Sequence, residues 1–171
     1  VVLTATDSSG AVDTQSFTVN VAALNTEFQV NTYTTGAQYQ PSITSLNDGG
    51  LVISWTSAGQ DGSVTGVFAK VYNSDGTTRN LELQVNSTTL NAQTEPSVLA
   101  LDSGGFLVTW TSYVQDGSED GIFGQLFNSV GIKVGSEFQI NTTTSGSQSD
   151  SSVTSCNDGG FVVSWQSSSD F

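Results

Sequence analysis

The sequence predicts an all-β protein built from four-stranded antiparallel meander repeats of 55 residues, each resembling one blade of a β-propeller. Three observations carry this prediction: a constant repeat interval, apolar residues that alternate with a period of two, and a glycine-containing turn between predicted strands. The 55-residue interval needs no gap, and it is marked by the matched sets Asn31, Asn86 and Asn141; Gly50, Gly105 and Gly160; and Trp55, Trp110 and Trp165.

Each repeat contains four apolar runs separated by three turns. From Pro41 the chain reads PSITSLN, the turn NDGG, LVISWTS, the turn QDGS, GVFAKVYN, the turn NSDG and LELQVN. Glycine supplies the positive φ that tight turns require, and Asp or Asn accepts local backbone hydrogen bonds there. The short connections predict antiparallel neighbours joined as a meander.

The strand 121–128 (GIFGQLFN) indicates how the sheets pack. Ile122 and Leu126 share one face while Phe123 and Phe127 share the other, so both faces carry apolar side chains. The strand EFQIN (137–141) is apolar on one face only. This pattern favours small sheets stacked between copies of themselves, as in a propeller. A β-solenoid and a stacked β-sandwich are the alternatives.

The chain divides into three regions. Residues 1–21 are predicted to form a β-hairpin that turns at DSSG, and 22–26 a linker. Residues 27–171 form the repeat region, with units 27–80, 81–135 and a partial unit 136–171. The first hairpin resembles the end of a cadherin-like or immunoglobulin-like domain, and a divergent half repeat is the other interpretation.

The charge balance excludes some classes of partner. Three Lys plus Arg stand against 16 Asp plus Glu, which sets a net charge of −13. Nucleic acid and anionic membrane surfaces are bound mainly through Lys and Arg, so neither is expected as a partner. No apolar run is long enough to span a bilayer, so membrane insertion is not expected either. The hydroxyl-rich, weakly charged composition favours an extracellular or cell-surface location.

The residue inventory predicts no catalytic site and no bound cofactor other than calcium. The sequence has no His, which excludes Ser-His-Asp triads and imidazole zinc sites. Cys156 occupies the slot of Leu46 and Leu101 in the other repeats, so it is expected to pack as a small apolar side chain. Several acidic residues stand beside glycine in predicted turns, namely Asp48, Asp61, Asp75, Asp116 and Asp158.

Calcium is the candidate ligand for one acidic loop. The stretch QDGSEDG offers Asp116, Glu119 and Asp120 within seven residues, and Ca²⁺ prefers oxygen ligands of this kind. The matching loop of the first repeat has Val64 and Thr65 in place of the last two acids, so the site would not recur. Simple turn chemistry is the alternative.

Asn86 and Asn141 are candidate N-glycosylation sites. Both stand in N-x-S/T motifs, at equivalent positions that are predicted to be exposed. The equivalent Asn31 lacks the acceptor hydroxyl two residues on.

The tryptophans are predicted to lie in the core. Trp55, Trp110 and Trp165 each stand within the most apolar predicted strand of their unit. An exposed sugar-stacking platform is the alternative.

The 55-residue unit resembles tandem repeats of very large secreted or surface-anchored, adhesin-like proteins of bacteria and protists. The resemblance covers about residues 27–171 and rests on the blocks DGGFVVSWQS, QDGS, GIFGQ and EFQVNT, which occur in the same order at fixed spacing. It implies an extracellular repeat module and no catalytic residue.

The sequence therefore predicts a non-enzymatic spacer, adhesion or surface-coat element. Its expected partners are neighbouring repeats or copies of the same protein, and glycans. The alternative function is a subunit of an extracellular filament, in which strands of neighbouring copies complete one another's sheets. A carbohydrate-active enzyme is the third hypothesis considered.

Overall fold

The computed structural model describes residues 2–6, 12–16 and 28–168, the first two ranges by their backbone alone. All regular structure in these ranges is β-strand, and they contain no helix that could cross a membrane. β1 (Val2–Thr6) pairs antiparallel with β2 (Val12–Ser16), as the predicted hairpin requires. The predicted strand residues 17–21 and the linker 22–26 lie outside the described residues.

Two four-stranded antiparallel meanders and one strand pair follow the hairpin, and the predicted fold class is confirmed. The first sheet comprises β3 (Gln38–Ser45), β4 (Leu51–Ala58), β5 (Thr65–Tyr72) and β6 (Leu83–Gln84). The second comprises β7 (Gln93–Ala100), β8 (Phe106–Tyr113), β9 (Asp120–Phe127) and β10 (Lys133–Gln139). The pair is β11 (Gln148–Ser155) with β12 (Phe161–Ser167).

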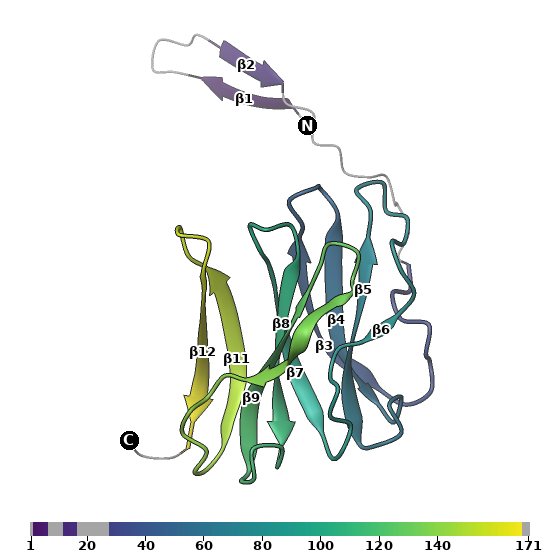
Figure 1. Cartoon of the computed structure of the whole chain (residues 1–171). Helices are drawn as coiled ribbons and strands as arrows, with labels where there is room; N and C mark the ends of the chain where they lie inside the picture. Colours follow the sequence, from purple (N-terminus) through teal and green to yellow (C-terminus); the bar gives the residue numbers. More distant parts are fainter. Residues whose placement is uncertain (1, 7–11, 17–27, 169–171) are drawn as a thin grey trace.

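The sheets stand side by side in chain order (Figure 1). The first strand of each sheet lies beside the first strand of the next, so β7 contacts β3 on one side and β11 on the other. β7 also packs on β4 and β5, and β11 packs on β8 and β9. The stacking is therefore face to face, as it is between propeller blades.

The core lies between the first and second sheets. Val52, Val67 and Val71 on one face of the first sheet meet Phe106 and Trp110 on the facing side of the second, and all five are fully buried. In the second sheet, which lies between the other two, apolar side chains on both faces thus pack against two different neighbours. This explains why the pattern resembles a buried sheet and not the one-sided alternation of a solvated one.

The predicted burial of the tryptophans is confirmed for two and wrong for the third. Trp55 is 4% exposed and Trp110 is 0% exposed, but Trp165 is 38% exposed. Trp55 stands opposite Phe68 on β5, and Trp110 stands opposite Phe123 on β9. In the described part of the chain no strand pairs with the far edge of β12, so the Trp165 indole lacks this cross-strand aromatic cover.

The sheets are offset from the predicted unit boundaries. The unit 27–80 was expected to begin at the EFQVN segment, but the equivalent segment 82–86 closes the first sheet instead of opening the second. The N–H of Val85 donates to the carbonyl of Val67, which lies on the preceding strand. Each four-stranded sheet therefore ends with the LELQVN-type segment, as the meander that starts at Pro41 predicts, whereas the unit boundaries 27–80 and 81–135 place this segment at the start of a unit.

The first strand of every sheet carries a β-bulge that the sequence did not indicate. Gln40, Glu95 and Asp150 lie at the three bulges, with φ angles of 53°, 58° and 55°. Positive φ is uncommon for residues other than glycine. Its recurrence at one repeat position shows that the bulge is a regular part of the repeat structure.

Candidate functional site

The interfaces between repeats hold most of the buried polar chemistry of the described chain. Asn86 follows the first sheet and is 1% exposed. Its Oδ1 accepts a hydrogen bond from the N–H of Val67 at 2.8 Å, and its Nδ2 donates to Gln93 Oε1 at 3.1 Å and to Asp61 Oδ2 at 3.3 Å. One side chain thereby joins the first sheet, the QDGS turn and the first strand of the second sheet.

Asn141 makes the same contacts one repeat later. It is 4% exposed, accepts from the N–H of Ile122 at 2.8 Å and donates to Gln148 Oε1 at 3.0 Å and Asp116 Oδ2 at 3.2 Å. The predicted exposure of Asn86 and Asn141 is therefore wrong, because both amides are buried as hydrogen-bonding centres. In this fold neither amide nitrogen is accessible for attachment of a glycan.

The three predicted calcium ligands have different environments. Asp116 accepts from the N–H of Ser118 through Oδ1, within its own turn, and from Asn141 through Oδ2, at the repeat interface. Asp120 Oδ2 accepts from Ser147 Oγ at 2.7 Å, while the Glu119 side chain makes no hydrogen bond with described residues. No group of three potential metal ligands occurs within residues 28–168, so the geometry lends the calcium hypothesis no support.

The three bulge residues form a hydrogen-bonded ladder between the first strands of the sheets. Gln40 Oε1 accepts from the backbone N–H of Glu95 at 3.1 Å, and Glu95 Oε2 accepts from the backbone N–H of Asp150 at 3.1 Å. Each side chain also accepts from the second strand of its own sheet: Gln40 from Thr56, Glu95 from Thr111 and Asp150 from Gln166. The bulge orients the side chains of Gln40 and Glu95 toward the next repeat, and this contact explains why the bulge recurs.

Two further carboxylates, Glu137 and Glu82, each hold the fourth strand of a sheet to the segment that precedes that sheet's first strand. Glu137 accepts from the N–H of Ser87 at 2.5 Å and from Gln115 Nε2 at 2.6 Å. Glu82 accepts from the N–H of Thr32 at 2.6 Å and from Gln60 Nε2 in the same way. These carboxylates are structural acceptors, and they lie too far along the chain from the QDGS motif for the sequence to have paired them.

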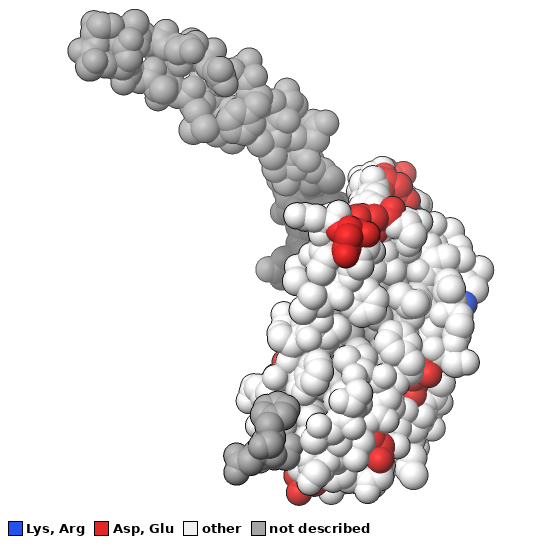
Figure 2. Space-filling view, turned by 60° about the vertical axis from the view of Figure 1, so that its left-hand side comes forward, with Lys and Arg blue, Asp and Glu red and all other residues white. Residues whose placement is uncertain are grey.

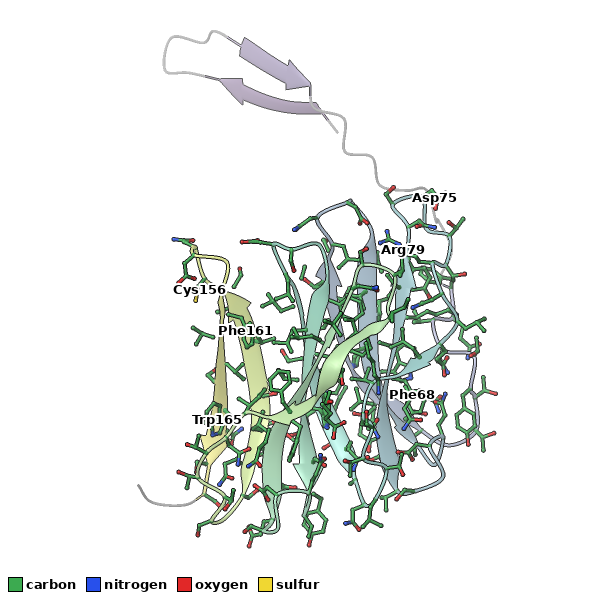
Figure 3. All side chains as sticks on the ribbon, in the orientation of Figure 1. Phe68, Asp75, Arg79, Cys156, Phe161 and Trp165 are labelled. Carbon is green, nitrogen blue, oxygen red and sulfur yellow. The ribbon has the colours of Figure 1, made fainter. Side chains whose placement is uncertain are left out.

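Arg79 bridges two sheets near the turns (Figure 3). Its Nη1 donates to Asp48 Oδ2 at 2.8 Å and to the carbonyl of Ser129 at 2.9 Å, and its Nε donates to Asn73 Oδ1 at 3.0 Å. The hydrogen bond from Arg79, with a further one from the N–H of Gly50, holds the pKa of Asp48 below its ordinary value.

Cys156 is half-buried and unpaired, in the turn that precedes β12 (Figure 3). Its N–H donates to the carbonyl of Gly160, as the N–H of Leu46 does to the carbonyl of Gly50. Leu46 is buried, whereas Cys156 is half-buried at the equivalent position, as the repeat interval predicts for its place but with a more exposed side chain.

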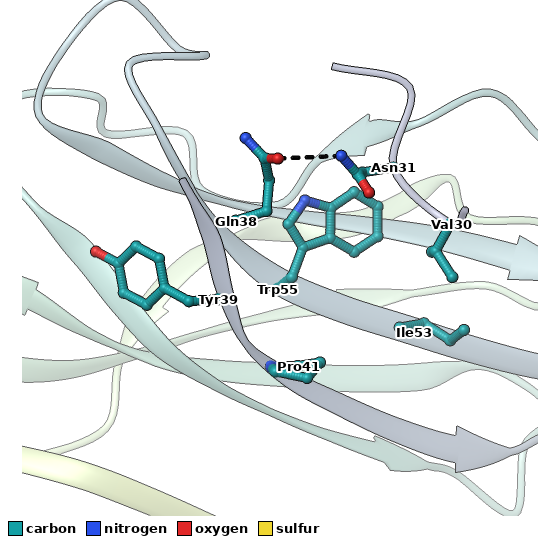
Figure 4. Close-up of a pocket in the computed structure, with 7 residues that line it drawn as sticks. All are labelled: Val30, Asn31, Gln38, Tyr39, Pro41, Ile53 and Trp55. Atoms are coloured by element: carbon teal, nitrogen blue, oxygen red, sulfur yellow. Dashed lines mark hydrogen bonds between the residues drawn. The ribbon is translucent and has the colours of Figure 1, made fainter. Parts of the chain in front are cut away.

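An apolar pocket of about 180 Å³ lies beside Trp55 (Figure 4). Its other lining residues are Val30, Asn31, Gln38, Tyr39, Pro41 and Ile53. The buried Trp55 Nε1 has no hydrogen-bond partner, but neither has the Nε1 of Trp110, which lies in the closed core. The unpaired indole N–H is thus a property of the repeat and does not single out this pocket as a ligand site.

The visible surface is sparsely charged (Figure 2). Acidic residues gather near the top of this face and appear at separate places lower down, and a basic group is visible at its right-hand edge. This distribution agrees with acids placed at turns and repeat interfaces.

No family model matches the sequence, and no curated protein matches it. Among solved structures, the chain is similar to the endo-arabinase from Bacteroides thetaiotaomicron VPI-5482, with a TM-score of 0.51 and 15% sequence identity. The likeness covers 75% of this chain and 50% of the endo-arabinase, so the chain spans about half the length of that protein. This likeness concerns the fold alone.

Proposed function

We propose that this chain is a non-enzymatic repeat module of an extracellular or cell-surface protein, serving as a spacer, adhesion or coat element. The observation that carries the proposal is the use of its acidic and amide side chains. Glu95, Glu137 and Asp116 each accept hydrogen bonds across a repeat interface, and Gln40, Glu82 and Asp61 make the matching bonds one repeat earlier. Groups committed to such bonds hold the array together and are not free for acid–base chemistry.

Stacking of equivalent units suits such a role because each unit is supported by its neighbours. An array extends a surface by adding units, and many equivalent weak contacts on it act together as avidity. The low density of surface charge and the abundance of hydroxyl side chains fit an extracellular setting.

Labelling of intact cells of the producing organism tests the proposal. Antibodies against the repeat region are expected to bind non-permeabilised cells or the culture medium, and brief external proteolysis should remove the signal. Antigen that is accessible only after permeabilisation would contradict an extracellular role.

A turnover assay addresses enzymatic function. The structural likeness makes arabinose-containing polysaccharides the first substrates to test. No release of reducing ends is expected. Turnover by the wild type that disappears in Glu95→Gln or Asp150→Asn would replace the proposal with a carbohydrate-active enzyme.

The filament is the second candidate, and apolar exposure on the outer sheets favours it. Ile43 on β3 is 64% exposed, and Val162 and Trp165 on β12 are 53% and 38% exposed. The equivalent residues of the second sheet, Val98 and Trp110, are buried between repeats. Light scattering after size-exclusion chromatography distinguishes the candidates: a spacer stays monomeric as concentration rises, whereas a filament subunit forms open-ended polymers.

A further inference from the structure

Lys70 presents a buried ammonium group with no carboxylate beside it. The residue lies on β5 and is 8% exposed. Its Nζ donates to the carbonyl of Val30 at 3.1 Å, and no carboxylate of the described residues lies within ion-pair distance of it. A lysine ammonium has three N–H donors, and buried charges in proteins are normally paired. Lys70 thus has donors to spare at a place where an anion would be stabilised.

A pocket of about 510 Å³ opens onto this ammonium. Tyr33 and Leu81 supply apolar surface, and Thr32, Thr78 and Asn80 supply hydroxyl and amide groups. Leu81 is 88% exposed, so it forms part of the rim. The volume lies within the range of about 300–1,000 Å³ that is typical of small-molecule sites.

Glu82 also lines the pocket but does not neutralise Lys70. Its Oε2 accepts from the N–H and the hydroxyl of Thr32 at 2.6 and 2.8 Å, and its Oε1 accepts from Gln60. Oε2 therefore belongs to the contact with the segment before β3, and Oε1 belongs to the contact with the turn between β4 and β5.

The second repeat has a different residue and a longer fourth strand at the equivalent place. Gln125 replaces Lys70 there, and its Nε2 donates to the carbonyls of Leu126, Val134 and Gly135 at 3.0, 3.3 and 3.3 Å. These bonds help to hold the long strand β10 against β9. β6 has two residues where β10 has seven. In the first repeat Thr78 bridges to Tyr72, and residues 79–82 connect it to β6 without strand structure. Thr78 and residues 80–82 line the pocket beside Lys70.

We propose that this Lys70 pocket binds a saccharide that carries a single carboxylate group, such as a uronic acid. One ammonium with free donors matches one carboxylate, and charge-assisted hydrogen bonds of this kind are among the strongest in proteins. The hydroxyl and amide side chains match the hydroxyls of a sugar ring, and Tyr33 and Leu81 match its apolar face. The inference is independent of the proposed function, since it concerns a ligand site in the first repeat only.

A titration with defined sugars tests the proposal. Wild-type protein is titrated with D-glucuronate, D-glucose and acetate at about 0.15 M salt, where screening limits the effect of the net negative charge. Amide NMR shifts locate the site and calorimetry measures the affinity. Glucuronate is expected to perturb Thr32, Tyr33 and Asn80 and to bind at least about tenfold more tightly than glucose, since a hydrogen bond to a charged group has that effect.

Three substitutions provide the matched controls. Lys70→Gln introduces the residue of the second repeat and should lower glucuronate affinity about tenfold while leaving the weak glucose affinity unchanged. Lys70→Arg retains the charge and should retain the preference for glucuronate. Lys133→Gln removes a lysine whose Nζ donates to Ser87 at an exposed site, and it should change nothing.

Several results would overturn the proposal. Absence of shifts around Lys70 at millimolar glucuronate would exclude the site. Equal glucuronate affinity in wild type and Lys70→Gln would exclude the ammonium as its anchor. Acetate binding as tight as glucuronate binding would exclude recognition of the sugar ring.

Discussion

Asn86 illustrates how one side chain joins two repeats. Its amide oxygen satisfies the buried N–H of Val67, and its amide nitrogen satisfies Gln93 and Asp61. Asn31 is the equivalent residue before the first sheet, and it is half-buried, with bonds to Tyr33 and Gln38. Asparagine therefore contributes differently to the free energy of unfolding at the two positions, because a buried polar group that loses its partner costs more than one that water can reach.

Asn86→Ala should destabilise the protein by about 2–4 kcal/mol, since it leaves at least two buried polar groups without partners. Asn31→Ala should cost under about 1 kcal/mol, because water can reach the freed groups. Urea unfolding measures both. Equal losses for the two variants would contradict the assigned role of burial.

Asp48 predicts a pH dependence of stability. Hydrogen bonds from Arg79 and Gly50 lower its pKa in the folded protein, while the unfolded chain has a value of about 3.9. The interaction therefore contributes above about pH 4 and is lost as the pH falls through the lower folded value. We expect the stability difference between wild type and Asp48→Asn to be constant from neutral pH to about pH 4 and to close below it. A difference that is unchanged in acid would show that another group is responsible.

At the scale of strands and sheets, the two faces of the second sheet pack against different neighbours. Trp110 on β8 faces the first sheet with Phe106 and Phe123, while Leu107 of the same strand lies on the opposite face, and both side chains are fully buried. Gly105, which precedes β8, lies so close to the carbonyl of Phe127 that no Cβ fits there. The glycine repeated at 50 and 105 is therefore required by the close approach of the third strand.

Trp110→Ala should cost about 3–5 kcal/mol, because the substitution leaves a large cavity in the closed core. Trp165→Ala is the matched control, since the same side chain is 38% exposed there, and its loss should be under about 2 kcal/mol. Denaturant melts measure both. A small loss at Trp110 would place that indole outside the energetic core.

The whole molecule is a stack in which support differs from sheet to sheet. The second sheet is packed on both faces, by β3–β5 on one side and by β11 on the other. The β11–β12 pair is packed on one side, and Phe161 and Trp165 on β12 are partly exposed (Figure 3). Elements with less buried apolar contact open with lower free energy.

Amide hydrogen exchange should therefore show a gradient along the stack. We expect the slowest exchange in β5 and β8, which have paired strands on both sides, and faster exchange in β12. The comparison is made at a pH where reclosing is faster than exchange, so that the rates report the free energy of opening. Protection of β12 equal to that of β8 would contradict independent opening of the last pair.

The sequence by itself determined the strands, the meander and the burial of Trp55 and Trp110. These features depend on the alternation of apolar and polar residues, on turn residues and on a repeat interval, and all three can be read directly from the sequence. Only the tertiary structure decided that Asn86 and Asn141 are buried, that Trp165 is partly exposed and that Lys70 has a pocket. Each of these depends on a segment many residues away that covers the side chain or leaves it open, and a periodic pattern carries no information on that cover.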